Sequence, residues 1–458
     1  MLCRAETEGG GTTGMKREHT QMMTSGPITR QLIRFSVPLV LGNLFQLSYN
    51  MVDTIVVGRF TGSAGLAATG TCDQIMSLLI LGVSGVCIGA SVLMGNFFGA
   101  KDREQLLAEM KTTVSLGLIF AALIMAAGIP MTGAVLRLMR IQPEAMQDGL
   151  TYLRIIFLGL PFMCLYNTYA AALRSVGDSD TPVRYLVLSC VINICTDLLL
   201  VAGFRLGVAG AAIATVLAQG ISALMCIRHV SRHVPELRFS WRTLRMDRDL
   251  AVRTLSYGGL TALQQCSQPI GNIIIQSSVN TLGVTAAAAF SAVRKIEDIG
   301  LLPGRSISSG ITAFTAQNEG AELHDRTREG FRKAMGLELG CGLLVSAFVL
   351  LLRQPLMSLF TTNGEIVLAG VDYFRVIGFC YWLPCLTNGY QGYFRGIGRM
   401  GTTLLATLTQ ISVRVGVTLL TVPAIGLPGA GLACVAGWSL MILWQIPWQI
   451  HCSRRLRD

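Results

Sequence analysis

Residues 207–220 read GVAGAAIATVLAQG, and residues 426–439 read GLPGAGLACVAGWS, the same pattern of small and apolar residues displaced by 219 positions. Two further pairs of segments repeat at nearly the same displacement. GNFFGAKD (95–102) aligns with AQNEGAEL (316–323), and LRSVGDSDTP (173–182) aligns with FRGIGRMGTT (394–403), both at a shift of 221 residues. Three matches at almost one spacing indicate an internal duplication.

The composition indicates that this duplicated chain folds in a membrane. Of its 458 residues, 52% are hydrophobic and only 14% are charged, whereas soluble domains carry about 25% charged residues. A disordered chain and a nucleic-acid-binding domain are therefore excluded, despite the net charge of +11. The 13 cysteines are scattered without a CxxC pair and lie mostly in apolar runs, so we read them as small buried residues rather than bridges or metal ligands.

Twelve apolar runs are long enough to cross the bilayer, which takes roughly 20 helical residues. Their expected limits are 31–58, 64–94, 109–136, 148–173, 181–203, 207–230, 253–281, 284–316, 333–353, 366–394, 400–423 and 427–450. The sequence therefore predicts an all-α polytopic membrane protein with twelve transmembrane helices in two six-helix pseudosymmetric lobes. Six spans return the chain to the same side, so the two halves have parallel topology, an architecture typical of transporters that bind substrate between repeats.

Positive charge gives the expected orientation, because cytoplasmic segments retain Lys and Arg. With the N-terminus inside, 26 of the 37 basic residues lie in or next to inside segments and 5 lie in outside loops. We therefore expect an inner (plasma) membrane protein with both termini in the cytoplasm. The expected parts are a flexible cytoplasmic tail (1–27), an N-lobe with spans 1–6 (28–235), a basic cytoplasmic linker (236–252) and a C-lobe with spans 7–12 (253–458). The tail lacks the apolar core of a signal peptide, and translation could start at Met1 or Met15.

Two carboxylates are expected at the same depth in the N-lobe. The acidic residues expected away from helix ends and loops are Asp53, Asp73, Asp197, Glu297, Asp298 and Glu338. A mid-membrane Asp costs about 2.5–3.5 kcal/mol to insert, which makes each a functional candidate. Asp53 and Asp197 lie five and six residues before the outer ends of outward-running spans 1 and 5, roughly 7–9 Å below the boundary.

Polar side chains surround these carboxylates in the expected helices. Tyr49 precedes Asp53 by one turn, Asn193 precedes Asp197 by one turn, and Thr215 of span 6 falls near the same level. Such oxygens can hold a hard cation such as Na⁺. The same carboxyl groups can instead hold a proton, because burial and a like-charged neighbour favour the protonated acid. A purely structural role in joining helices is the alternative reading.

The runs FSVPLVLGNLFQLSYNMVDTIVVGR, MGNFFGAKD, ALRSVGDSDTP and INICTDLLLVAGFRLGVAGAAIAT resemble the multidrug and toxic compound extrusion (MATE) family, in its prokaryotic branch, over residues 28–450. The resemblance implies an exporter of organic cations or other amphipathic substrates in exchange for H⁺ or Na⁺, with no other cofactor. It implies a coupling site at Asp53, Asn193 and Asp197, supported by Tyr49 and Thr215. Some members carry a second carboxylate site in spans 7 and 10. This chain has none there, so it resembles the subgroup that couples through the N-lobe alone.

Further residues are expected in the substrate cavity or at hinges. Arg294 and Asp298 are spaced to pair with each other, and the 221-residue shift places Arg294 opposite Asp73. Flexible thioethers and aromatic faces suit promiscuous binding of cations. The expected cavity residues are Asp73, Arg294, Gln264, Gln268, Met163 and Tyr166. Pro38, in the same helix as Asp53, is the expected hinge of span 1.

The sequence leaves three functional classes open. A cation-coupled drug exporter is favoured by the Asp pair. A lipid-linked precursor flippase or an exporter of an endogenous metabolite in the same superfamily is the alternative, and a flippase would need several cavity Arg or Lys residues. An enzyme is disfavoured, because the sequence has no HExxH motif, no phosphate-binding P-loop and no recognisable catalytic grouping. The expected partners are small-molecule substrates and the lipid bilayer, without nucleic acid, and a monomer suffices for this mechanism.

Overall fold

The computed structural model describes residues 22–455, which form helices and connecting turns without a strand. Most of the predicted tail, and Met15, lie outside the described residues. The α-helices are α1 (Ile28–Gly99), α2 (Arg103–Leu138), α3 (Met146–Ser175), α4 (Asp180–Asp197), α5 (Gly207–His233), α6 (Arg248–Asn280), α7 (Val284–Gly300), α8 (Leu302–Gly320), α9 (His324–Ser358), α10 (Gly364–Ile377), α11 (Trp382–Gly396), α12 (Met400–Ile425) and α13 (Leu427–Arg455). The all-α polytopic fold predicted from the sequence is confirmed.

Helix α1 contains two of the predicted spans. Its 72 residues would measure about 108 Å if straight, far more than the hydrocarbon thickness of about 30 Å. The chain breaks inside it at Gly62, whose φ of 74° and ψ of −170° no other residue type adopts without strain. The glycine thus ends the first span and begins the second within a single hydrogen-bonded run.

Twelve membrane-length segments follow when α1 is divided at Gly62 and when α7–α8 and α10–α11 are each taken as one span. By length and apolarity alone, eight helices qualify among the described residues, or nine when α10 and α11, bent by 50°, are joined. Helix α7 has only 17 residues, and α6 and α8 are rich in Gln, Ser, Thr and Gly. Most of α8 is buried, and α6 buries Thr254, Thr261 and Gln264, so these polar side chains do not face lipid.

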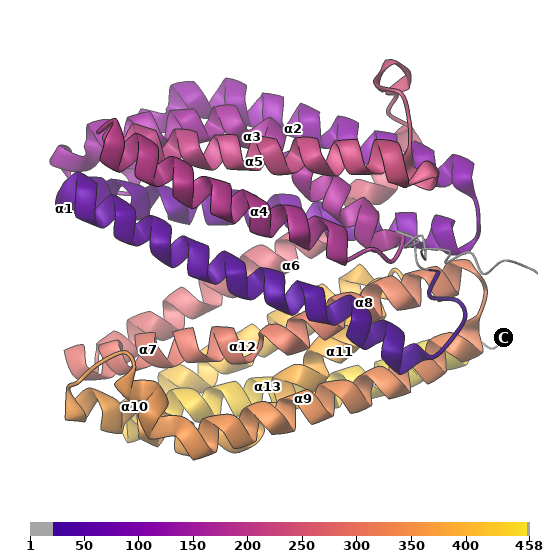
Figure 1. The fold of residues 1–458 in the computed structure, drawn as a ribbon. Coiled ribbons are helices and arrows are strands. Elements are labelled where there is room, and N and C mark those ends of the chain that lie inside the picture. The colour runs from indigo at the N-terminus through magenta and orange to yellow at the C-terminus, as the bar shows by residue number, and fades with distance from the viewer. Residues whose placement is uncertain (1–21, 456–458) are drawn as a thin grey trace, which may run out of the picture.

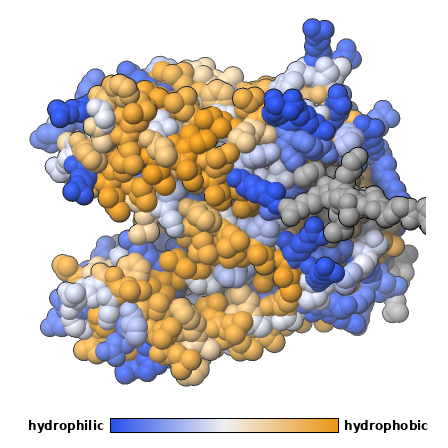
Figure 2. Space-filling view, viewed as in Figure 1, coloured by the Kyte–Doolittle hydropathy of each residue, from blue (hydrophilic) through white to orange (hydrophobic). Residues whose placement is uncertain are grey.

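The helices form two bundles that meet at one end. Figure 1 shows α2–α5 in the upper bundle and α7–α13 in the lower bundle, with α1 and α6 running between them. Helix α1 packs against both α6 and α8. Figure 2 shows an apolar belt over both bundles, polar residues at the two ends, and a notch between the bundles at the end away from the C-terminus. The protein is therefore a multi-pass membrane protein with a cleft between its bundles.

Glycines close the opposite end of this cleft. A Cβ added to Gly89 of α1 would lie 2.4 Å from the backbone nitrogen of Gly258 in α6. At the repeated GNFFGAKD and AQNEGAEL segments, a Cβ on Gly99 would lie 1.9 Å from the Gln317 carbonyl oxygen, and one on Gly320 would lie 2.0 Å from that of Asn96. The duplicated motif therefore makes a reciprocal backbone contact between the two bundles, of the kind that small residues permit in membranes.

The segment before α1 reinforces this closed end. The Met23 backbone N–H donates to Gln317 Oε1 at 2.8 Å, and Gln317 Nε2 donates to the Ser175 carbonyl at 2.8 Å. Arg326 of α9 donates to the carbonyls of Met23 (3.2 Å) and Gly26 (2.9 Å). Residues of both bundles and of the N-terminal segment are thus tied together on the side away from the notch.

The close approach of α1 and α6 predicts a difference between two Gly→Ala variants of the same helix. Gly89→Ala should lower the thermal unfolding midpoint in detergent, because overpacking a close contact costs about 1–3 kcal/mol. Gly70→Ala should leave the midpoint unchanged or slightly raised, since no atom lies within 4 Å of its added Cβ. Equal midpoints for the two variants would contradict the tight packing at Gly89.

Candidate functional site

Five polar residues predicted from the sequence come together in the N-terminal bundle. Helix α1 presents Tyr49 and Asp53 one turn apart, α4 presents Asn193 and Asp197, and α5 presents Thr215. Asp197 is 0% exposed and Asn193 is 1% exposed, whereas Asp53 is partly exposed. Three helices therefore bring one partly open carboxyl group up to a fully buried polar pair.

The hydrogen bonds leave oxygen atoms of the carboxyl groups unused. The Asn193 side-chain amide, oriented to satisfy both of its polar atoms, donates to Asp197 Oδ2 at 2.7 Å and accepts from the Thr215 backbone N–H at 3.1 Å. The Asp53 and Asp197 carboxyl groups lie within hydrogen-bond reach of each other, as do the Tyr49 and Thr215 hydroxyls. Oδ1 of Asp53 and Oδ1 of Asp197 are buried and accept no hydrogen bond within residues 22–455.

This arrangement can take up a positive charge. Two carboxyl groups side by side cannot both be ionised without strong repulsion, unless a proton or a metal cation lies between them. The unused Oδ1 atoms offer oxygen ligands of the kind that hard cations prefer. Within residues 22–455, no three His, Cys, Asp or Glu residues are arranged to hold a metal ion, so any bound cation would also need hydroxyl, amide or water oxygens.

The backbone beside Asp197 departs from an α-helix. Residues Leu198–Gly203, directly after α4, form a π-helical segment, and the Phe204 N–H reaches back to the Leu199 carbonyl. Single π-turns inside helices occur often at functional sites, because the inserted residue changes where neighbouring side chains point. The residue pattern after Asp197 does not predict this π-helical segment, and Gly203, at which the segment ends, is the one local signal for it.

Asp73 joins the same region through a tyrosine that the sequence analysis missed. The Tyr152 hydroxyl of α3 donates to Asp73 Oδ1 at 3.4 Å, and Tyr152 is 5% exposed. Asp73 interacts electrostatically with Asp53. The second half of α1 thus adds a third carboxyl group to the environment of Asp53, on the side facing α3. Nothing in the spacing of Tyr152 marks it as a partner of an acid 79 residues away.

Four other residues that were predicted to line the substrate cavity lie in different surroundings. Gln264 Nε2 donates to Gln391 Oε1 and Thr407 Oγ1, both at 2.9 Å, whereas Gln268, one turn on, is exposed. Met163 is 3% exposed within the apolar core of the N-terminal bundle, and the Tyr166 hydroxyl donates to the Pro182 carbonyl at 3.2 Å. Of these four residues, Gln268 is exposed, whereas Gln264 and Met163 are buried and the Tyr166 hydroxyl is hydrogen-bonded.

The predicted ion pair between Arg294 and Asp298 is wrong. Arg294 pairs with Glu297 at 3.4 Å, one position closer than the expected Asp298, which instead pairs with Arg305 at 3.2 Å. Glu297 is 4% exposed, and its Oε1 accepts hydrogen bonds from the hydroxyls of Tyr373 and Tyr381, both at 3.1 Å. Arg294 neutralises this buried carboxylate from three residues away on the same helix, while the two hydroxyl donors lie on α10 and just before α11 and could not be found from helix spacing.

Two other buried charged groups lie in the C-terminal bundle. Arg414, at the repeat position of Asn193, is 6% exposed and donates to Asn272 Oδ1 at 3.1 Å. Glu338 of α9 is 0% exposed, and neither carboxyl oxygen is hydrogen-bonded within residues 22–455. It packs against Gly304 and Gly389, away from solvent.

Comparisons with known proteins agree with one another. The profile of the family described as MatE matches residues 38–199 and 261–420. "Probable multidrug resistance protein YoeA" of Bacillus subtilis is 29% identical over 399 residues, covering 86% of each chain. "FAD transporter" of Shewanella oneidensis is 26% identical over 385 residues, covering 81% of each chain. A solved structure described as an outward-facing conformation of a multidrug resistance MATE family transporter superposes with a TM-score of 0.90 at 23% identity, covering 96% of this chain and 99% of that one.

The hydroxyl pair on Glu297 predicts a stability effect of Tyr381→Phe. Removing one donor from a buried charged acceptor should destabilise the protein by about 1.5–3 kcal/mol and lower its thermal midpoint. Tyr390→Phe is the matched control, since no hydrogen bond of the Tyr390 hydroxyl occurs among the described residues and its ring contacts with Phe331 and Phe394 would remain. Equal thermal midpoints for Tyr381→Phe and Tyr390→Phe would show that the hydrogen bond from Tyr381 to Glu297 does not stabilise the protein.

Proposed function

The chain belongs to the MatE family, and from that premise we propose that it exports multiple drugs or organic cations from the cell by antiport with H⁺ or Na⁺. The names of its relatives, which are described as multidrug resistance or multidrug export proteins, support export of small molecules. The facing carboxyl groups of Asp53 and Asp197 are the observation that carries the coupling proposal, because they can exist in a charged and a neutralised form.

Neutralisation of the carboxyl pair is the proposed coupling step. An ionised pair in a low-dielectric bundle is costly, and a proton or Na⁺ removes much of that cost. Asp53 is partly exposed, so a cation can reach it, while Asp197 is held by Asn193 behind it. A bound organic cation would satisfy the same charge, so coupling ion and substrate would compete for it. That competition is the physical requirement of antiport.

The cleft supports alternating access between the two bundles. With both termini in the cytoplasm, the notch in Figure 2 faces outward, and the closed end at Gly89, Gly99 and Gly320 faces the cytoplasm. Export then requires the glycine contact to separate while the outer notch closes, as in other transporters built from repeats. One copy of the chain contains the whole cleft, so we propose a monomer in the inner membrane.

The proposed substrate cavity lies between the bundles. Asp73 contributes charge near the carboxyl pair, while Gln264, Gln268 and Tyr166 contribute neutral polarity and an aromatic face. Met163 would contribute only if the core around it rearranges, since it is now packed. Arg294 carries its own counter-ion in Glu297 and would therefore act on a substrate mainly through its exposed edge.

An endogenous metabolite is the second candidate substrate class, favoured by the relative described as an FAD transporter. The flippase alternative needs cavity cations that are free to bind a pyrophosphate group. Arg294, Arg305 and Arg375 are paired with Glu297, Asp298 and Asp372 respectively, whereas Lys295, Arg154 and Arg414 form no ion pair among the described residues. Retained cell-wall synthesis together with lost drug resistance in a deletion strain would separate export from flipping.

The carboxyl pair predicts the result of an efflux experiment. Cells loaded with a fluorescent organic cation should expel it when the protein is expressed and either a pH or a Na⁺ gradient is imposed, and the effective gradient identifies the ion. Asp53→Asn and Asp197→Asn should reduce this efflux to the level of cells without the protein, because the neutral amide cannot change its charge. Asp372→Asn, which removes an exposed acid paired to Arg375, should retain it. Gradient-driven efflux by Asp53→Asn at the wild-type rate would rule out the proposed coupling.

The proline in α1 predicts a second, independent result. The only non-helical backbone inside α1 is at Gly62, so the helix continues through Pro38, but that position lacks a backbone N–H and bends at low cost. If α1 bends there when Asp53 is neutralised, Pro38→Ala should slow efflux and flatten its dependence on the ion gradient. Pro130→Ala in α2 is the control, since that proline also lies inside a helix of the same bundle. Unchanged efflux and ion dependence in Pro38→Ala would remove the hinge from the mechanism.

A further inference from the structure

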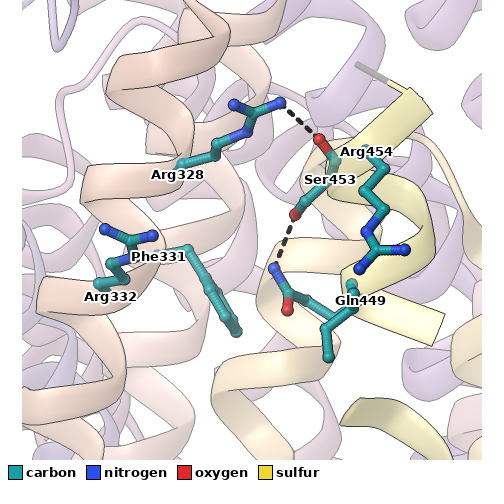
Figure 3. Close-up of a pocket in the computed structure, with 7 residues that line it drawn as sticks. Arg328, Phe331, Arg332, Gln449, Ser453 and Arg454 are labelled. Atoms are coloured by element: carbon teal, nitrogen blue, oxygen red, sulfur yellow. Dashed lines mark hydrogen bonds between the residues drawn. The ribbon is translucent and has the colours of Figure 1, made fainter. Parts of the chain in front are cut away.

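A hollow unrelated to the cleft lies between the first turns of α9 and the last turns of α13. Its volume is about 290 Å³. The residues that line it are Arg328, Phe331, Arg332, Gln449, Ile450, Ser453 and Arg454. Figure 3 shows Arg332 on the α9 side and Arg454 on the α13 side, with the Phe331 ring and the Gln449 amide between them. The hollow is therefore open, rimmed by guanidinium groups and backed by an aromatic ring.

The charge of this hollow is not balanced within the described chain. Arg328 donates to the Ser453 carbonyl and pairs with Asp325 at 3.5 Å, an acid whose side chain is fully exposed. Arg332 and Arg454 form no ion pair within residues 22–455. Two guanidinium groups thus remain to bind an anion, and their forked donors suit the oxygens of a phosphate group.

The floor of the hollow is rigid. The Phe331 ring packs against Tyr390 and Tyr393 of α11, with ring centroids 5.3 and 4.7 Å apart. The Tyr393 hydroxyl lies 3.2 Å from Ser453 Oγ, and Gln449 Nε2 donates to the same oxygen at 2.7 Å. Helix α11 therefore fixes the ends of α9 and α13 relative to each other, and the hollow does not depend on a flexible loop.

Tryptophans of α13 place the hollow at the surface of the bilayer. Trp444 and Trp448 stack with ring centroids 5.9 Å apart, and Trp448 Nε1 donates to Thr402 Oγ1 at 3.0 Å. Trp residues gather where a helix passes from hydrocarbon to headgroups. Gln449 and Ile450 follow Trp448 directly, so the arginines next to them lie at headgroup level.

An apolar path runs from the hollow toward the middle of the membrane. On α9, one face continues from Arg332 through Gly336 and Gly340, where an added Cβ would meet no atom within 4 Å, to Leu343, which is 51% exposed. On α13, the face of Ile450 continues through exposed Ile446 to Leu443, which is 65% exposed. These open positions and exposed apolar side chains leave room for acyl chains beneath a charged headgroup.

We propose that this hollow binds the phosphate headgroup of an anionic phospholipid in the membrane leaflet on the side of the chain ends. Arg332 and Arg454 contact the phosphate, Gln449 donates to its glycerol or headgroup oxygens, and the acyl chains lie along Gly336 and Ile446. Basic pockets between transmembrane helices commonly bind anionic lipids in this way. The site is separate from Asp53 and Asp197, so it does not depend on the transport activity.

Lipid titration of the purified full-length protein tests this site. Phosphatidylglycerol added to protein in neutral detergent should raise the thermal midpoint, and native mass spectrometry should detect one retained lipid. Phosphatidylcholine with the same acyl chains, and inorganic phosphate, should do neither. Arg332→Gln with Arg454→Gln should weaken phosphatidylglycerol binding about thirtyfold, since each basic residue at an anionic lipid surface contributes about fivefold.

A matched double variant controls for net charge. Arg137→Gln with Arg140→Gln removes two exposed arginines at the opposite end of the bundles and should keep wild-type binding of phosphatidylglycerol. Arg332 and Arg454 are also exposed, so both double variants should unfold at the wild-type midpoint without lipid. Equal effects of the two phospholipids, or unchanged binding by the Arg332 and Arg454 variant, would overturn the proposal. The same midpoint rise with inorganic phosphate would also overturn it, by assigning the site to a free anion.

Discussion

The contact between Asp53 and Asp197 constrains the rest of the N-terminal bundle. Two carboxyl groups within hydrogen-bond reach, inside a bundle surrounded by lipid, are tolerable only if one is neutralised or if donors surround them. Among the described residues, the Asn193 amide donates to Asp197 Oδ2 and is itself fixed by the Thr215 backbone N–H. Asp197 is thereby held in place, while Oδ1 of Asp53 accepts no hydrogen bond within residues 22–455. In the proposed mechanism, the cation that neutralises the pair would also stabilise this bundle.

The glycine contacts at the closed end of the cleft are connected to the carboxyl pair through helix α1. Helix α1 carries Asp53 in its first half and Gly89 and Gly99 in its second, so one continuous chain segment connects the carboxyl pair to the contact between bundles. Backbone-to-backbone packing through glycine involves no long side chains that must rearrange. Such a contact can separate and reform as a unit, and its loss would expose backbone rather than large apolar side chains. This geometry suits the proposed alternating access, in which the bundles would move as rigid bodies.

The sequence predicted the parts of the molecule that follow from burial cost and helical spacing. Asp53, Asp197, Asn193, Tyr49 and Thr215 could be grouped because they share a depth in adjacent spans, and the structure brings all five together. The partners of Glu297 could not be found, because Tyr373 and Tyr381 lie 76 and 84 residues away and their approach depends on how α10 bends into α11. The π-helical turn after Asp197 and the exact partner of Arg294 likewise depend on local backbone geometry. The spacing of residues predicts which side chains share one face of a helix, but it does not predict how the neighbouring helix is rotated against that face.

The two bundles differ in the groups that surround their buried acids. In the C-terminal bundle, Glu297 receives two tyrosine hydroxyls and an arginine, so its negative charge is already compensated and a further cation would gain little. Glu338 lacks partners, but it is 0% exposed and packed against glycine backbone, so no ion in solution reaches it directly. Asp53 of the N-terminal bundle, by contrast, is partly exposed and has a carboxyl oxygen that accepts no hydrogen bond within residues 22–455. Because a binding ion can shift an equilibrium only by its differential affinity for the two states, the proposed coupling is best supported at an acid that a cation can reach and whose oxygen lacks a hydrogen-bond donor. The two bundles differ in the donors around their buried acids, and the proposed coupling site lies in the N-terminal bundle.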